Sequence, residues 1–100
     1  MVDDAAPGGP TVSQRVRVVN RRGLHARAAA RFVKLAGEFD ADVRVTHGDV
    51  TVSGTSIMGL LTLAAAAGSE LLLTAEGNEA EPAITALASL VAMGFGEDVE

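Results

Sequence analysis

The chain has 100 residues, a formal net charge of −5 and no cysteine, tryptophan or tyrosine. This length fits one domain with one hydrophobic core, and the absence of cysteine excludes disulfides, thiol catalysis and sulfur-ligated zinc. No apolar run is long enough to span a membrane, and the acidic start lacks the basic region of a secretory signal, so we expect a cytoplasmic location.

The first elements are read from composition and alternation. Residues 1–10 contain two prolines and two glycines, which predicts a disordered N-terminal tail. From residue 11 apolar and charged side chains alternate, with Val16 and Val18 on one side and arginines on the other. This period of two predicts a half-buried strand.

His25 is expected to stand at a helix start. The polar segment 20–23 ends in glycine and is typical of a loop. Apolar positions spaced three and four apart then predict a helix over residues 26–38, which puts His25 at or next to its N-cap. Ser, Thr, Asp or Asn usually occupies that position. Helix stability alone therefore does not explain a histidine there.

The surroundings of His25 favour anion chemistry. Free amides, the positive end of the helix dipole and the Arg27 guanidinium together form an anion site. This field opposes further positive charge, so we expect a neutral, nucleophilic imidazole near pH 7. A phosphoryl group fits such donors best. The hypothesis is that His25 accepts and passes on phosphate; the alternative is a surface histidine near a chance helix start.

Two further strands and a turn follow the first helix. Alternating residues at 42–46 and 50–53 flank His47-Gly48-Asp49, which predicts a hairpin. We expect His47 to be exposed in this turn and to have no functional role. Two histidines and scattered acids do not have the spacing of a metal site, so no metal is predicted.

The last third predicts two helices and a strand. Apolar periodicity indicates a helix over residues 56–67 that Gly68 ends, with Ser56 as a common N-cap residue. Residues 70–76 form a strand, and residues 79–93 form a final helix with its proline in the first turn. The order β-α-β-β-α-β-α predicts an α+β fold, an antiparallel sheet covered on one face by helices.

Charge is distributed unevenly along the chain. All eight basic residues lie between Arg15 and Arg44, and eight acidic residues but no basic one follow Val45. Nucleic-acid binding usually needs a basic domain, and a glycine-rich loop for ATP is absent. A compact basic patch around His25 suits a phosphate group and an acidic protein partner. A solvated helix face is the alternative.

Two segments resemble a known family. Asn20–Ala29 is similar to the active-site segment of HPr, the histidine-containing phosphocarrier of the bacterial phosphotransferase system, and Gly54–Leu61 is similar to its regulatory-serine helix. The resemblance covers roughly residues 11–96. The chain departs from the family at Ala28, commonly proline, and at Arg22, which is Asn or Ser in many relatives.

The resemblance implies a fold and an activity. The fold is an open-faced β-sandwich of four antiparallel strands and three helices, with a phosphocarrier domain at 11–96 and a C-terminal tail at 97–100. Enzyme I, charged from phosphoenolpyruvate, would phosphorylate His25 on Nδ1, and an enzyme IIA histidine would take the group. Arg27 would balance charge, and the amides of Ala26 and Arg27 would receive oxygens. The protein would be a monomeric carrier without cofactor rather than a stand-alone enzyme.

Regulation and docking residues follow from the same resemblance. Relatives are phosphorylated at the position of Ser56 by HPr kinase/phosphorylase, although capping alone explains a serine there. Partners dock on the short helix at Ile57 and Met58; adjacent helical positions point about 100° apart, so we expect one in the core and one exposed. Lys34 is a rim residue of a docking face or simply solvated.

Three functions remain open from the sequence. The first is a general carrier feeding sugar uptake, and the second is a carrier in a nitrogen-related branch without transport. The third is a binding or regulatory protein whose phosphorylated state alone matters. Since His25 is intact, a relative that kept only serine regulation is disfavoured.

Overall fold

The structure is a computed structural model that describes residues 11–97. The tail expected at residues 1–10 and the last three residues lie outside this range. The elements in chain order are β1 (Thr11–Arg17), α1 (Ala26–Ala36), β2 (Asp42–His47), β3 (Val50–Ser53), α2 (Ile57–Thr62), β4 (Glu70–Glu76), α3 (Ala80–Ala92) and the 3₁₀ turn η1 (Gly94–Gly96).

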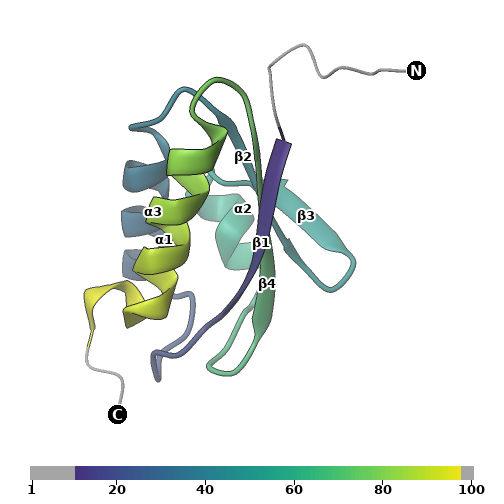
Figure 1. Ribbon diagram of the computed structural model, residues 1–100. Coiled ribbons are helices and arrows are strands. Elements are labelled where there is room, and N and C mark those ends of the chain that lie inside the picture. Colours follow the sequence, from purple (N-terminus) through teal and green to yellow (C-terminus); the bar gives the residue numbers. More distant parts are fainter. Residues whose placement is uncertain (1–10, 98–100) are drawn as a thin grey trace.

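The four strands form one sheet with helices on one face (Figure 1). Its order is β1-β4-β2-β3, and every neighbouring pair is antiparallel. This confirms the α+β open-faced sandwich predicted from the sequence. Within residues 11–97, no helix has the length and apolarity that crossing a bilayer requires.

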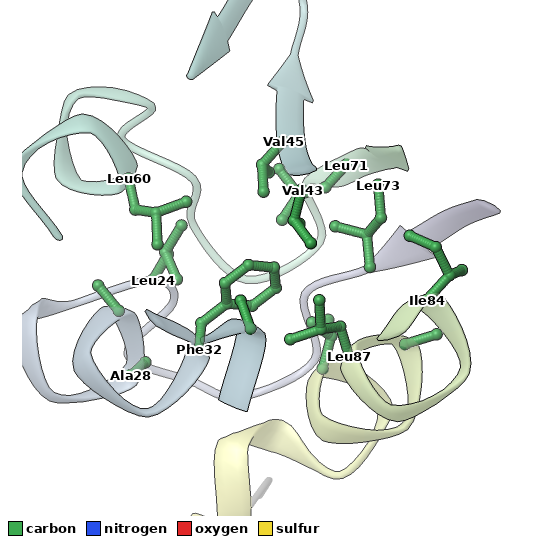
Figure 2. Close-up of a cluster of buried hydrophobic side chains, with 14 of the residues drawn as sticks. Leu24, Ala28, Phe32, Val43, Val45, Leu60, Leu71, Leu73, Ile84 and Leu87 are labelled. Atoms are coloured by element: carbon green, nitrogen blue, oxygen red, sulfur yellow. The ribbon is translucent and has the colours of Figure 1, made fainter. Parts of the chain in front are cut away.

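The core lies between the sheet and the helices. On β4 every second side chain is buried, and on β2 the buried side chains are Val43 and Val45, as the pleat of a half-covered sheet requires. Figure 2 shows Phe32 of α1 in the middle of the cluster, between Val43 of the sheet and Leu87 of α3. Burying one side chain of this size stabilises the fold by roughly 1.5–3 kcal/mol, so the amphipathic α1 is fixed firmly against the sheet.

Helix α2 is much shorter than predicted, because it ends at Thr62 and Gly68 does not terminate it. Ala64 has a φ of 51°, a left-handed conformation that stops the helix. The turn it makes buries Ala65 and aims its carbonyl at the amide of Leu24, 2.9 Å away. The alanine-rich sequence continues the helical pattern, but tertiary contact ends the helix.

The segment after α3 turns back toward the start of α1. After α3, Phe95 takes a φ of 58° and is completely buried. The Arg31 side chain of α1 donates a hydrogen bond to the Phe95 carbonyl. Figure 1 shows η1 at the same end of the molecule as the beginning of α1. The C-terminal turn, residues 94–97, is thereby placed beside the first helix.

Candidate functional site

His25 is the N-cap of α1, as the sequence predicted. Its backbone is extended, with φ −81° and ψ −179°, and its carbonyl accepts the amide hydrogen of Ala29 at 2.8 Å. The ring Nδ1 accepts from the backbone amide of Arg27 at 3.3 Å. Ala28, where the family commonly has proline, is buried in the intact first turn. A histidine therefore serves in the position normally filled by a short polar side chain.

The loop before α1 is held by its own backbone. Gly23 has a φ of 70°, and a Cβ there would lie 2.6 Å from the Ala65 carbonyl oxygen. Only glycine allows this approach without strain. The Gly23 carbonyl in turn accepts from the His25 amide at 2.9 Å. Glycine at this position thus fixes the position of the His25 backbone, which carries the ring.

Glu97 contacts the second ring nitrogen of His25, and this residue was not predicted from the sequence. Its Oε2 is hydrogen-bonded to His25 Nε2, although we assigned Glu97 to the tail. The side chains are 16% exposed for His25 and 18% for Glu97. Two glycines around Phe95 are a sequence signal for a turn. Nothing local indicates where that turn packs.

Hydrogen bonds and charges act on the Glu97 carboxyl. Partial burial raises its pKa, but hydrogen bonds from Asn20 and His25, together with the charges of His25 and Arg22, outweigh burial and leave the pKa below its ordinary value. The carboxylate is therefore the favoured form. A carboxylate can only accept hydrogen bonds, so Nε2 of His25 must carry a hydrogen in this contact.

Asn20 connects the loop to Glu97. Among residues 11–97, Asn20 is the one polar residue that is fully buried. Its Nδ2 donates to the Gly23 carbonyl at 2.9 Å and to Glu97 Oε1 at 3.0 Å. Both acceptors require the NH₂ group on that side, so the amide orientation is determined. Its Oδ1 has no partner within residues 11–97, a cost for a buried polar atom.

The surface around this end of α1 is basic. Arg21, Arg22 and Arg27 are exposed there, and the first turn of α1 contains no acidic residue. Lys34 is also exposed, but it belongs to the last turn of the helix, about 13 Å further along its axis. The sequence-predicted basic patch therefore surrounds His25, and Lys34 lies at the opposite end of α1.

Ser56 is the N-cap of α2, with its Oγ accepting from the Gly59 amide at 2.9 Å. The two next side chains are both exposed, Ile57 by 39% and Met58 by 73%. The prediction that one of them enters the core is wrong. In this helix of six residues, the buried side chain is Leu60, so the first turn points outward.

His47 differs from its prediction. It ends β2 rather than lying in the turn, is half-buried, and its Nδ1 is hydrogen-bonded to the Leu63 carbonyl at 2.9 Å. This bond joins the hairpin to the end of α2. In the part of the chain that the structure describes, no three His, Cys, Asp or Glu side chains gather as a metal site would require.

Comparison with known proteins agrees with this geometry. Residues 12–93 match the family model PTS-HPr, the PTS HPr component phosphorylation site. The chain is 42% identical to phosphocarrier protein HPr of Neisseria meningitidis, covering 86% of this chain and 97% of that one. It is 37% identical to phosphocarrier protein NPr of Shewanella violacea, covering 86% and 94%.

A similar fold is found among solved structures. The crystal structure of HPr-C-His from Thermoanaerobacter tengcongensis superposes with a TM-score of 0.83 at 38% identity, covering 87% of this chain and 98% of that one. The match covers most of both chains, so the two proteins share their overall fold.

Proposed function

Since the chain belongs to the HPr family of phosphotransferase-system phosphocarriers, we propose that His25 accepts a phosphoryl group on Nδ1 from enzyme I and passes it to a histidine of an enzyme IIA. One observation carries this proposal. The Nδ1 atom faces the start of α1 at the surface of the protein, where the amide of Arg27 points at it. The ring nitrogen that carries the lone pair, Nδ1, therefore lies beside the backbone amides that can bind a phosphoryl group.

The contact at Nδ1 is easily exchanged. A distance of 3.3 Å is longer than the usual 2.9–3.0 Å of such bonds, so the amide is held weakly. When a phosphoryl group bonds to Nδ1, the backbone amides of Ala26 and Arg27 can donate hydrogen bonds to its oxygens instead. The positive end of the helix dipole adds to this attraction.

Arg27 supplies mobile positive charge. Its side chain is exposed, so its guanidinium can reach oxygens of the group in transit. Phosphoryl transfer depends mainly on positioning and charge stabilisation, and each partner can supply half of the site. A surface helix start holds the phosphate loosely enough for it to leave.

Docking is proposed to use the same face. Helix α2 packs against α1, and its exposed Ile57 and Met58 offer an apolar contact to a partner, since Met adapts to several partners. An acidic partner surface would be attracted by Arg21 and Arg22, with Lys34 as a more distant rim contact. We propose that the carrier works as a cytoplasmic monomer without a cofactor.

The branch in which it works has two candidates. Relatives with the names HPr and NPr match at 42% and 37% identity, so both sugar uptake and a nitrogen-related branch are supported. The third function, a regulatory protein without onward transfer, differs by its lack of an acceptor. Neighbouring genes for sugar permeases would favour the first branch, and an isolated enzyme IIA gene the second.

One assay tests carriage directly. The protein is incubated with enzyme I and phosphoenolpyruvate, and then with candidate enzyme IIA proteins. We expect acid-labile phosphate on His25, loss of labelling in His25→Ala, slower labelling in Arg27→Ala and transfer to one enzyme IIA. Normal labelling of His25→Ala would refute the proposal, and labelling without onward transfer would support the regulatory alternative.

Phosphorylation of Ser56 is a second candidate function. Ser56 lies at the start of α2 next to the exposed Ile57 and Met58. A phosphate there is tolerated by the helix dipole but places negative charge on the proposed docking face. HPr kinase/phosphorylase with ATP should therefore label the wild type and not Ser56→Ala, and labelling should slow phosphoryl transfer from enzyme I.

A further inference from the structure

The His25 ring is held from both nitrogens. Nδ1 accepts from the Arg27 amide, and Nε2 meets the Glu97 carboxylate. A neutral imidazole carries one hydrogen, on one nitrogen or the other. The amide requires a lone pair on Nδ1, and the carboxylate requires a hydrogen on Nε2. Two independent contacts thus select the same tautomer, in which Nδ1 is the free nucleophile.

The two contacts also orient the ring. The bond at Nδ1 is exposed, and the bond at Nε2 is partly buried. A partner approaching from solvent therefore meets Nδ1 first. Without the carboxylate, the ring could rotate about its Cβ–Cγ bond and would lose only the long hydrogen bond from the Arg27 amide. Glu97 is the group that determines which nitrogen faces outward.

The Glu97 side chain is held by Asn20, and the turn that carries Glu97 is anchored at Phe95. Asn20 Nδ2, fully buried, donates to its Oε1 at 3.0 Å. The preceding Phe95 is buried in the core, and its carbonyl is bound by Arg31. A carboxylate held only by exposed side chains could easily leave this position. Here the contacts come from the loop before α1, from the core and from α1 itself. The carboxylate position is therefore built into the fold.

We propose that Glu97 is a positioning residue for phosphoryl transfer, which rests on the carrier function proposed above. It holds His25 in the tautomer with hydrogen on Nε2 and turns Nδ1 toward the partner. Carboxylates and carbonyls fix the tautomer of functional histidines in this way.

The carboxylate also balances charge during the step. The Nδ1 lone pair attacks phosphorus of a phosphohistidine donor and forms the new N–P bond. The donor's N–P bond breaks, and its electron pair returns to the donor nitrogen. The His25 ring keeps its Nε2 hydrogen and becomes positive, with Glu97 beside it. In onward transfer the N–P electron pair returns to Nδ1, and the ring becomes neutral again.

The test combines a spectroscopic and a kinetic measurement on the full chain. Nitrogen NMR spectra of isotope-labelled histidine report which ring nitrogen carries hydrogen in the unphosphorylated protein. We expect the Nε2–H tautomer in the wild type and a mixture in Glu97→Ala, with phosphoryl acceptance from enzyme I slower by about tenfold, as loss of a hydrogen bond to a charged group predicts.

Glu97→Gln separates position from charge. Its amide offers one acceptor oxygen where the carboxylate offers two, to His25 Nε2 and Asn20 Nδ2, so we expect a partly retained Nε2–H tautomer with an intermediate rate. This variant decides the matter if Glu97→Ala does not fold. Glu38→Gln, an exposed carboxylate beyond the far end of α1, is the matched control and should leave both readouts unchanged.

Two results would overturn the inference: hydrogen on Nδ1 in the wild type, or unchanged tautomer and rate in Glu97→Ala. An unchanged rate in Glu97→Gln together with an unfolded Glu97→Ala would do the same. The spectra need no phosphate. If wild-type His25 takes no phosphate at all, the proposed function fails while the tautomer result still stands, so the two failures are distinguishable.

Discussion

The amide of Leu24 donates a hydrogen bond of 2.9 Å to the carbonyl of Ala65. This bond joins the loop before α1 to the segment after α2, two regions 41 residues apart by their numbers (65 − 24). His25 is the residue directly after Leu24. The position of its ring therefore depends on the path of the chain after α2. The approach is possible only because residue 23 has no side chain.

Replacement of Gly23 by alanine should therefore destabilise the protein strongly. A left-handed φ costs a non-glycine residue about 1–2 kcal/mol, and the forced contact with Ala65 adds about 1–3 kcal/mol. Gly48→Ala is the matched control, because Gly48 also has positive φ but nothing within 4 Å of an added Cβ. Denaturant unfolding should show a clearly larger loss for Gly23→Ala. Equal losses would contradict the close approach.

Asn20→Asp should be one of the most damaging conservative changes. It places a carboxylate oxygen against the Gly23 carbonyl and the Glu97 carboxylate, where Nδ2 now donates. An unpaired buried charge costs about 3–5 kcal/mol. Asn78→Asp makes the same change against Asp40 at the surface and should cost about 1 kcal/mol or less. Similar stability of the two variants in urea would disprove this account of Asn20.

Ser56→Ala tests the cap of α2. The Oγ bond to the Gly59 amide is lost, which should cost about 1 kcal/mol. Asp also caps well, so Ser56→Asp should restore most of the stability. Thermal unfolding measures both, and Ser13→Ala on the exposed side of β1 should change stability by less than about 0.5 kcal/mol. If Ser56→Ala matches Ser13→Ala, the cap contributes nothing.

The Glu97 contact should be lost in acid. Because its pKa is lower in the folded protein than the ordinary value of 4.5, the unfolded chain takes up the proton first as the pH falls. The stability it contributes is complete above about 4.5 and disappears as the pH falls through the lower folded value. Wild type should be more stable than Glu97→Gln at neutral pH, with the difference vanishing in acid. A difference independent of pH would contradict this.

Several local features were predictable from the sequence. The start of α1 at His25 follows from a glycine-containing polar loop and the apolar period after it, and β3 was predicted with its observed bounds. These features depend on neighbours within about one helical turn or one hairpin. A sequence pattern reports such short-range preferences directly.

The errors share one cause. Residues 63–67 have helical composition, but the contact of Ala65 with Leu24 overrides it. His47 was expected in solvent, but the end of α2 lies within hydrogen-bond distance of its ring. In each case a distant segment decides the outcome, and local propensity is too weak to resist it.

By itself, the sequence determined the order of elements, the helix start that carries His25 and the basic surface around it. Only the tertiary structure decided that Glu97, 72 residues later, contacts the same ring. The physical reason is that period and composition describe how a segment folds against an apolar layer. Which polar groups then meet depends on how the packed layers bring distant segments together, here the loop before α1 and the turn after α3.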